Sequence, residues 1–376
     1  MIAATIAALT LAIWIGLLVA RGGFWLARER DTRDLPGEQP NWPAVVAVVP
    51  ARDEAALIER SIGSLLAQDY PGPFRVILVD DSSTDGTAGI ARRLTGADRL
   101  EVLTGRPLAA GWTGKLWAVS QGVAQAGLVP RYLWLTDADI THAPDTLCSL
   151  VARAEPRGLV LVSLMAKLRC ESFAEHALIP AFVFFFQLLY PFGLVNKPNG
   201  IGAAAGGCML VRRDALAAAG GIAAIRAALI DDCALGAALK QQGPVWLGLT
   251  ERSRSIREYD TIDTVAAMIA RSAYSQLGYR PLVLLTTLAG LALVYVAPPV
   301  LALFGHGWPC IAGIAAWVLM AIALQPMLRF YRCSPLWGGA LPAIASFYAG
   351  CTLLSAWQHH RGRGGMWKGR AQAAAQ

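Results

Sequence analysis

The stretch that decides the fold is YLWLTDADITHAP, residues 132–144. Its apolar beginning, Tyr132 to Leu135, is followed by two carboxylates, Asp137 and Asp139, that are one residue apart. Two like charges at this spacing repel each other, and burying them at a strand end costs solvation. A hard divalent cation removes the repulsion, because it prefers carboxylate oxygens and takes waters and substrate phosphates as its other ligands. The pair therefore predicts a cation site, whereas a single aspartate would indicate only a helix cap or a turn.

The run that ends at Leu135 is one of several apolar runs between Ala44 and about Gln276. They alternate with helix-like stretches such as 54–68 and 86–96, which predicts an α/β fold with a mostly parallel sheet covered on both faces. Ligands of such sheets bind beyond the carboxyl ends of the strands. The runs are AVVAVVP (44–50), FRVILVDD (74–81), RLEVLTG (99–105), RYLWLTDAD (131–139) and LVLVSLMA (159–166).

The composition indicates a membrane protein. Of the 376 residues, 55% are hydrophobic and 16% are charged, whereas roughly a quarter of the residues of a soluble protein are charged. The net charge of +7 is expected to favour anionic lipid, and no stripe of basic and aromatic residues indicates nucleic acid. The seven cysteines are scattered without a CxxC pair, so the sequence predicts neither a zinc site nor a disulfide framework.

The first apolar segment is at the N-terminus. Residues 2–20 carry no charge, and as a helix these nineteen residues would reach about 28 Å. Arginines follow, the first at Arg21, whereas a signal peptide carries its positive charge before the apolar run. We expect an uncleaved transmembrane anchor at 1–22, with its C-terminal side in the cytoplasm, and a linker over 31–43.

Three more apolar segments predict a membrane region over 282–356, followed by a basic tail at 357–376. Arg329 and Arg332 lie between the last two segments and place that loop on the cytoplasmic side. Three full spans would put the tail outside, against the same rule, so a broken or re-entrant last segment stays open beside a full span. The segments are 282–304, 311–327 and 336–356.

One apolar run inside the α/β region, 178–195, is interrupted by Pro180, Gln187, Pro191 and Gly193. Proline removes a backbone donor and disfavours the helical conformation of the residue before it. We therefore expect an interfacial or core segment near the membrane here, not a span.

Two further strand ends carry acidic residues. Asp80 and Asp81 end the run VILVDD, and such carboxylates can accept hydrogen bonds from a nucleobase and from ribose hydroxyls. Asp53 and Glu54 lie at the start of the preceding helix-like stretch. The alternative after Asp80 and Asp81 is local, namely that Ser83 or Asp85 merely caps the next helix. The alternative for Asp53 and Glu54 is a capped helix start with acidic first-turn residues.

Lys115 and an acidic pair complete the set. Lys115, in GWTGKLWAVSQG (111–122), does not belong to a Walker A loop, but it can bring a cation to a diphosphate, unless it is a solvated surface lysine. Asp231 and Asp232 precede a helix-like stretch, where they either cap the helix or supply a base for a hydroxyl. Burial and a neighbouring negative charge would raise the pKa of such a base.

Six motifs follow one another in the chain: VVPARDEA, VDDSSTDGT, Gly-Lys at 114–115, TDAD, GGCMLVRRDAL and IDDCALG. Taken in this order, they resemble the family 2 inverting glycosyltransferases with the GT-A fold, over about residues 44–276. The anchor, catalytic domain and C-terminal spans resemble the ceramide glucosyltransferase-like branch. Within that branch, AGWTGKLWA, RSAYSQLGY, LRFYRCSPLW and the WKGR tail resemble the hopene-associated (hopanoid) glycosyltransferases of bacteria.

The resemblance implies a role for each position. It makes Asp139 the main ligand of Mg²⁺ or Mn²⁺, with Asp137 near the ribose and the metal. It makes Asp232 the catalytic base, with Asp231 in place of the usual glutamate. Glu54, Asp81 and Lys115 would contact the nucleotide or its diphosphate.

One departure concerns the Q/R-x-x-R-W motif of ceramide-type and processive relatives. The nearest match is MIARS, where Arg271 fits the arginine but Met268 and Ser272 replace the flanking residues. The resemblance therefore implies a single transfer, not polymer synthesis, with Arg271 holding the leaving diphosphate.

The expected function is transfer of a sugar from a UDP-sugar to a membrane lipid in hopanoid metabolism. The expected place is the bacterial inner membrane, multi-pass, with the catalytic domain facing the cytoplasm. A polyprenyl-phosphate sugar synthase is an alternative that needs a basic grip on the acceptor, for which Arg212, Arg213 and Lys240 are available. A second alternative, a non-catalytic membrane scaffold, predicts loss of some of the aspartates, and all of them are present. A third alternative, a nucleotidyltransferase, would leave a phosphate label on its product.

Overall fold

The computed structural model describes residues 1–32, 41–367 and 370–371. The chain divides into two units, and each is described by itself. The α/β unit holds 29–169, 194–258 and the residues from 366 onward, and the helical unit holds 1–28, 170–193 and 259–365.

This division differs from the domain boundaries expected from the sequence. Residues 170–193 and 259–276, which lie inside the expected domain 44–276, belong to the helical unit. Most of the expected linker, 33–40, and the end of the expected tail lie outside the described residues. Asp31, at the start of that linker, is buried and pairs with Arg252 at 3.2 Å.

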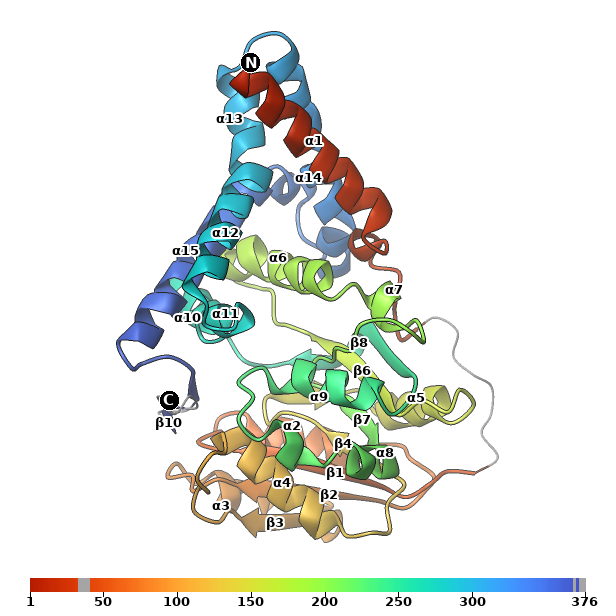
Figure 1. Cartoon of the computed structure of the whole chain (residues 1–376). Helices are drawn as coiled ribbons and strands as arrows, with labels where there is room; N and C mark the ends of the chain where they lie inside the picture. Colours follow the sequence, from red (N-terminus) through yellow and green to blue (C-terminus); the bar gives the residue numbers. More distant parts are fainter. Residues whose placement is uncertain (33–40, 368–369, 372–376) are drawn as a thin grey trace. The chain divides into compact units, whose positions relative to one another are not determined.

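An eight-stranded sheet forms the centre of the α/β unit (Figure 1). Its order is β3-β2-β1-β4-β7-β6-β8-β5, and six strands run in one direction while β7 and β5 run antiparallel to their neighbours. The five predicted strands are present as β1, β2, β3, β4 and β6, which confirms the mostly parallel α/β sheet. The strands are β1 (Val45–Ala51), β2 (Phe74–Asp80), β3 (Leu100–Thr104), β4 (Tyr132–Leu135), β5 (Ile140–His142), β6 (Leu161–Lys167), β7 (Met209–Arg212) and β8 (Val245–Ser255).

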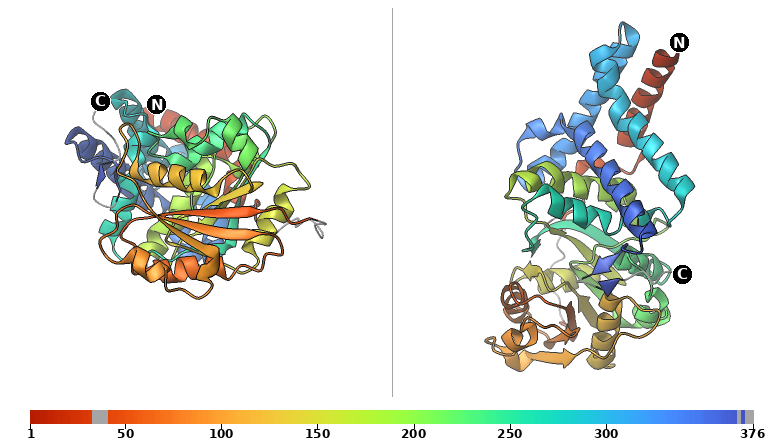
Figure 2. Two further views of the ribbon diagram at one scale, coloured as in Figure 1. Left: turned by 90° about the horizontal axis from the view of Figure 1, so that it is seen from below. Right: turned by 90° about the vertical axis from the view of Figure 1, so that its left-hand side faces the viewer.

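Helices cover both faces of this sheet (Figure 2, left). Every residue of β1 is buried, as expected for a parallel strand with helices on both sides. Helix α4 (Gly114–Ala126) packs closely on β1, because a Cβ added to Gly122 would lie 2.4 Å from Val48. The helices are α2 (Ile58–Leu66), α3 (Thr87–Ala91), α4 (Gly114–Ala126), α5 (Thr146–Ala154), α8 (Arg213–Ala218) and α9 (Asp231–Lys240), with 3₁₀ turns at Ala97–Arg99 and Ile222–Ile225.

The helical unit contains the apolar ends of the chain and the segment around α6. In it α14 packs against α1, α13 and α6, and α15 packs against α10 (Figure 2, right). Its helices are α1 (Ile2–Ala20), α6 (Phe173–Leu189), α10 (Ile262–Ala270), α11 (Ala273–Gln276), α12 (Pro281–Leu291), α13 (Ala297–Phe304), α14 (Trp308–Tyr331) and α15 (Leu341–His360). Short 3₁₀ turns lie at Phe24–Leu26 and Pro335–Gly338, and a π-helical turn lies at Ala292–Val296. The short helix α7 (Phe192–Val195) spans the unit boundary. In the α/β unit, β9 (Met366–Trp367) pairs with β10 (Arg370–Ala371).

Four helical segments of the described chain are long and apolar enough to cross a membrane: 2–20, 173–195, 281–304 and 308–331. Three of them coincide with expected spans. The fourth expected span, 336–356, is instead divided between a 3₁₀ turn and α15 and is not among the four.

The segment 173–195 differs from the expectation in its helical length. Pro180 lies within α6 without ending it, and α6 ends at Leu189, shortly before Pro191, as the restriction on the residue preceding a proline requires. In the apolar 18-residue window of this segment the buried share is 56%, against 11% for the window in 281–304. Its burial fits the expectation of a core segment, although its length and composition also suit a span.

Candidate active site

The carboxyl ends of β1, β2 and β4 bring the predicted acidic residues to one edge of the sheet. These three strands are parallel neighbours, so the segments that follow Ala51, Asp80 and Leu135 emerge side by side. The edge beyond parallel strands is where open α/β sheets bind their ligands. Seven of the eight predicted site residues lie in the α/β unit: Glu54, Asp81, Lys115, Asp137, Asp139, Asp231 and Asp232.

Lys115 joins two of these carboxylates. Its Nζ lies 2.9 Å from Asp137 Oδ1 and 3.0 Å from Asp231 Oδ2. Lys115 is in the first turn of α4 and Asp231 in the first turn of α9, where a negative charge is favoured by the helix dipole. Burial alone would lower the pKa of Lys115, but Asp137 and Asp231 raise it above its ordinary value. Lys115 is thus a fixed ammonium of the site and not a solvated surface lysine.

Asp232 lies beside this group with both carboxylate oxygens held. Its Oδ2 accepts the Gly206 N–H at 2.9 Å, and its Oδ1 accepts the Cys233 N–H at 2.7 Å. Burial, followed by the charge of Asp231, raises the pKa of Asp232 to about 6, although Lys115 acts in the opposite direction. A carboxylate with a raised pKa is a stronger base than an ordinary aspartate and is still ionised at neutral pH.

A pocket beside Asp232 has Lys115, Asp137 and Asp231 in its lining, together with Gly206, whose N–H donates to Asp232. Apolar side chains, among them Leu135 and Met209, form most of the rest of its wall. An apolar wall with a few convergent charged groups is the usual construction of a small-molecule site.

Arg257 connects Glu54 with Asp139. Its Nη2 lies 2.6 Å from Glu54 Oε1, and its Nε lies 2.6 Å from Asp139 Oδ2. The position follows from strand pairing: β8 runs antiparallel to β5 with Ser255 opposite Ile140, so the residues after β8 pass Asp139. Sequence reasoning missed Arg257, because the end of β8 reads TERSRS and carries no apolar run.

Asp81 is buried at the end of β2, with 2% of its surface exposed. Its Oδ2 lies 3.6 Å from Arg52 Nη1, which also donates to the Asp81 carbonyl oxygen at 2.6 Å. At the start of α3, Asp85 accepts the Thr87 N–H at 3.0 Å, and it also accepts the Ala55 N–H at 2.8 Å. The helix-capping alternative therefore applies to Asp85, which accepts the first N–H of α3, whereas the Asp81 carboxylate pairs with Arg52.

Asp137 and Asp139 fit a hard divalent cation. Each uses one carboxylate oxygen in its ion pair, Oδ1 of Asp137 with Lys115 and Oδ2 of Asp139 with Arg257, so each has a second oxygen to offer. Within the described part of the chain, no third carboxylate, histidine or cysteine joins them in a close group of three. A cation held here would take its other ligands from water and from a diphosphate, as Mg²⁺ commonly does.

Arg271 is the predicted site residue that the α/β unit does not contain. It follows α10 in the helical unit and is exposed. Its role toward a diphosphate stays a prediction.

Comparison with known proteins agrees with this construction. Residues 46–220 match the family described as Glycosyl transferase family 2. The chain is 37% identical to the succinoglycan biosynthesis protein ExoA of Rhizobium meliloti over 101 residues, which is 27% of this chain and 29% of that protein. It is 32% identical to the 4,4'-diaponeurosporenoate glycosyltransferase of Staphylococcus aureus over 128 residues, 32% of either chain. The matches thus span about a third of the length of these curated relatives.

Among solved structures, the chain is similar to a mannosyltransferase from Pyrobaculum calidifontis in complex with GDP-Man and Mn²⁺. The TM-score is 0.54 at 19% identity, over 95% of this chain and 99% of the other. A likeness at this identity shows a shared fold, of the GT-A type. The family match covers residues 46–220, which is just under half of the 376 residues.

Proposed function

We propose that the chain is an inverting glycosyltransferase that moves a sugar from a nucleotide-sugar to a membrane lipid with the help of a divalent cation. The observation that carries the proposal is Asp232, a carboxylate with a raised pKa beside the group of Lys115, Asp137 and Asp231. It lies in the α/β unit, which holds most of the residues that match Glycosyl transferase family 2.

Asp232 is the base of the proposed reaction. It takes the proton of the acceptor hydroxyl, whose oxygen attacks the anomeric carbon while the bond from that carbon to the diphosphate breaks. The N–H groups of Gly206 and Cys233 fix the orientation of the carboxylate during this step. Attack from the face opposite the leaving group inverts the anomeric configuration and needs no second carboxylate as nucleophile.

Lys115 and the start of α4 receive the charge of the leaving diphosphate. An ammonium has three donors, and two of those of Lys115 point to Asp137 and Asp231, which leaves the third for a phosphate oxygen. The N-terminus of a helix also favours an anion. A bound Mg²⁺ or Mn²⁺ would stabilise the charge that develops on the diphosphate.

The nucleotide part of the donor is assigned to the β1–β2 side of the site. Asp81 accepts from the base, and Glu54 lies on the same side, oriented by Arg257. Arg271 of the helical unit is the candidate second cation for the diphosphate. UDP-sugars are the first donors to test, on the resemblance of the motifs.

The lipid acceptor is supported by the apolar segments. Four helical segments long enough to cross a membrane place an enzyme at its substrate when that substrate is a lipid, whereas a water-soluble acceptor does not require them. One relative is named for glycosylation of 4,4'-diaponeurosporenoate. The resemblance of the sequence favours a hopanoid as acceptor and the bacterial inner membrane, with the catalytic domain facing the cytoplasm.

The polyprenyl-phosphate alternative is less well supported. It needs free basic side chains near Asp232, but Lys240 donates to two backbone carbonyl oxygens at 2.6 Å. Arg212 and Arg213 lie at the end of β7 that pairs with the start of β4, at Tyr132, and not with its carboxyl end. A lipid hydroxyl needs no such grip.

The experiment uses membranes that contain the full chain, hopanoid-rich lipid extract, Mn²⁺ or Mg²⁺, and UDP- and GDP-sugars labelled either in the sugar or in the β-phosphate. The proposal expects sugar label, and no phosphate label, in the organic-soluble lipid. Label from the β-phosphate in the lipid would instead indicate phosphosugar transfer, because nucleotidyl transfer would carry only the α-phosphate to the acceptor and would leave neither label there. No label in any lipid, with donor binding intact, would contradict the lipid acceptor.

A further inference from the structure

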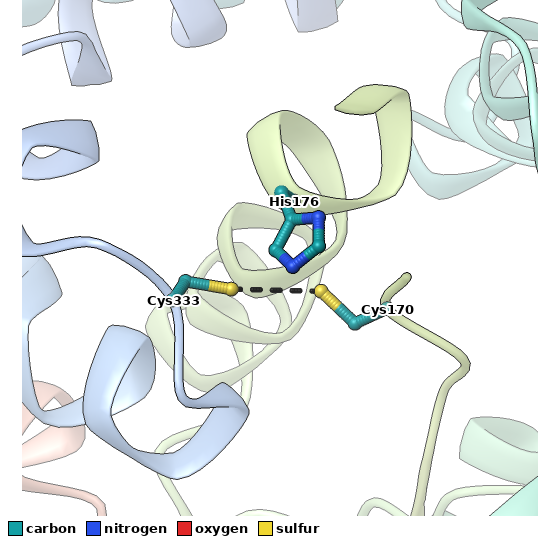
Figure 3. A group of neighbouring side chains, drawn as sticks. All are labelled: Cys170, His176 and Cys333. Carbon is teal, nitrogen blue, oxygen red and sulfur yellow. Dashed lines mark hydrogen bonds between the residues drawn. The ribbon is translucent and has the colours of Figure 1, made fainter. Parts of the chain in front are cut away.

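Three metal-binding side chains meet in the helical unit, although nothing in their sequence spacing indicates it. They are Cys170, His176 and Cys333, and 163 residues separate the two cysteines. Their ligand atoms all lie within 4.8 Å of one another, and the two sulfurs are 3.6 Å apart. Figure 3 shows the His176 ring with one nitrogen directed toward the two sulfurs. All three residues are half-buried.

The backbone on the α6 side is held by a capping box. The Ser172 side chain accepts the Glu175 N–H at 3.1 Å, and the Glu175 side chain accepts the Ser172 N–H at 2.9 Å. Glu175 is fully buried, so the first turn of α6 is fixed. Cys170 lies just before this turn and His176 within it.

The tautomer of His176 follows from one hydrogen bond. Its Nδ1 lies 2.8 Å from the carbonyl oxygen of Ser172, which can only accept, so Nδ1 carries the proton and Nε2 carries the lone pair. Metal-binding histidines are commonly oriented in this way, with one ring nitrogen donating to a carbonyl oxygen and the other facing the metal.

The third ligand is placed by the end of α14. The helix ends at Arg332 in the left-handed conformation, with φ of 58°, and the Cys333 N–H then donates to the Leu328 carbonyl oxygen at 2.9 Å. This termination turns Cys333 back toward α6, and a bound ion would connect the start of α6 to the end of α14.

The sulfur–sulfur distance suits a tetrahedral zinc ion. With Zn–S bonds of about 2.3 Å and Zn–N bonds of about 2.0 Å, two bound sulfurs lie about 3.8 Å apart and a sulfur and a nitrogen about 3.5 Å apart. The observed sulfur–sulfur distance of 3.6 Å is near the first value, whereas a disulfide needs about 2.0 Å.

We propose that Cys170, His176 and Cys333 form a zinc site in the helical unit. The two thiolates balance the charge of Zn²⁺, the imidazole binds as a neutral ligand, and binding releases the two thiol protons. Three protein ligands leave the fourth position to water or another small ligand. This site differs in kind from Asp137 and Asp139, because sulfur and imidazole select zinc where carboxylates select Mg²⁺ or Mn²⁺.

The test uses the full chain, purified in detergent with a reductant, stripped with a chelator and titrated with Co²⁺. We expect a thiolate-to-cobalt absorption in the near ultraviolet that saturates at about one equivalent and that Zn²⁺ abolishes. Cys170→Ser, Cys333→Ser and His176→Gln should weaken Co²⁺ binding by at least about 100-fold, because changes outside the ligand shell alone cost about 10–100-fold. Cys310→Ser, which changes a cysteine outside the cluster, should leave it unchanged.

A measurement on the unmodified chain guards against variants that fail to fold. Zn²⁺ should protect two thiols, those of Cys170 and Cys333, from alkylation, as mapped by mass spectrometry. The proposal is overturned by the absence of the cobalt band in the unmodified chain, by its persistence in Cys170→Ser and Cys333→Ser, or by a Cys170–Cys333 disulfide in the reduced protein. None of these readouts depends on sugar transfer, so a failure of the zinc proposal can be distinguished from a failure of the proposed function.

Discussion

The Nζ atom of Lys115 lies 2.9 Å from Asp137 Oδ1 and 3.0 Å from Asp231 Oδ2. One ammonium thus connects the acidic pair after β4, which fits a cation, with the acidic pair at the start of α9, which contains the proposed base. The two motifs are about ninety residues apart in the sequence. Their connection through Lys115 is the basis of the account of the site.

Replacing Lys115 by methionine should lower kcat about 100-fold, because removing one charge-stabilising donor from a catalytic site typically costs about 10²–10³. Lys115 also lowers the pKa of Asp232, so its loss should move the acid limb of the pH profile to higher pH. Both effects are measured from kcat/KM against pH. Lys167→Met, which removes a different ion pair, with Glu251, is the control and should leave the limb in place.

The pH profile of the unmodified enzyme should report Asp232. The base must be ionised, and it becomes protonated as the pH falls through its raised pKa of about 6. We therefore expect kcat/KM, at saturating Mn²⁺, to be level at neutral pH and to fall about tenfold per pH unit below about pH 6. An acid limb near the ordinary aspartate pKa of about 4 would contradict the assignment.

Arg257→Gln tests the fit of a cation at Asp139. The change removes the guanidinium that lies 2.6 Å from both Glu54 and Asp139, so the two carboxylates repel each other and the melting temperature should fall by a few degrees. Mn²⁺ bound to Asp139 would supply the missing positive charge, so Mn²⁺ should reduce the difference between variant and wild type. Thermal unfolding with and without Mn²⁺ measures this.

The control for this variant is Arg254→Gln, an exposed arginine of β8 whose Nε donates to the Glu251 carbonyl oxygen. It should show no Mn²⁺-dependent change in melting temperature. If the deficit of Arg257→Gln is equal with and without Mn²⁺, Asp139 is not a ligand.

Gly236→Ala tests how α9 carries the base. A Cβ at Gly236 would lie 2.4 Å from the backbone carbon of Ala203, so α9 would have to move away. Overpacking of this kind typically costs about 1–3 kcal/mol, and the movement should also displace Asp232 and lower kcat. Thermal unfolding and kcat are measured together. Gly63→Ala, in α2, where a Cβ meets nothing within 4 Å, should preserve both.

The sequence predicts the strands β1, β2, β4 and β6 well and the strands β7 and β8 poorly. β1, β2, β4 and β6 are buried on almost their whole length and therefore appear as apolar runs. β7 has four residues, and β8 ends in a polar alternation that no apolar run marks. Arg257 could not be predicted for this reason, since its place beside Asp139 depends on the pairing of β8 with β5.

The individual site motifs could be predicted, but their partners could not. Asp137, Asp139, Asp231 and Asp232 stand out as acidic pairs at strand and helix ends. That Lys115 connects them is a property of the sheet, because α4 and α9 meet at its carboxyl edge only in the folded chain. The Cys170–Cys333 contact is missed for the same reason, because spacing rules detect only cysteines that are close in sequence.

The measurement that tests the central claim most directly compares the wild type with Asp232→Asn in transfer of labelled sugar to lipid, together with donor affinity and the anomeric configuration of the product. Asp214→Asn is the control, because Asp214 also lies in the first turn of a helix, α8. We predict a loss of about 10²–10⁴-fold in transfer for Asp232→Asn, little change in donor affinity, and an inverted anomeric centre in the wild-type product. Transfer by Asp232→Asn at the wild-type rate, or a product with retained configuration, would contradict the account.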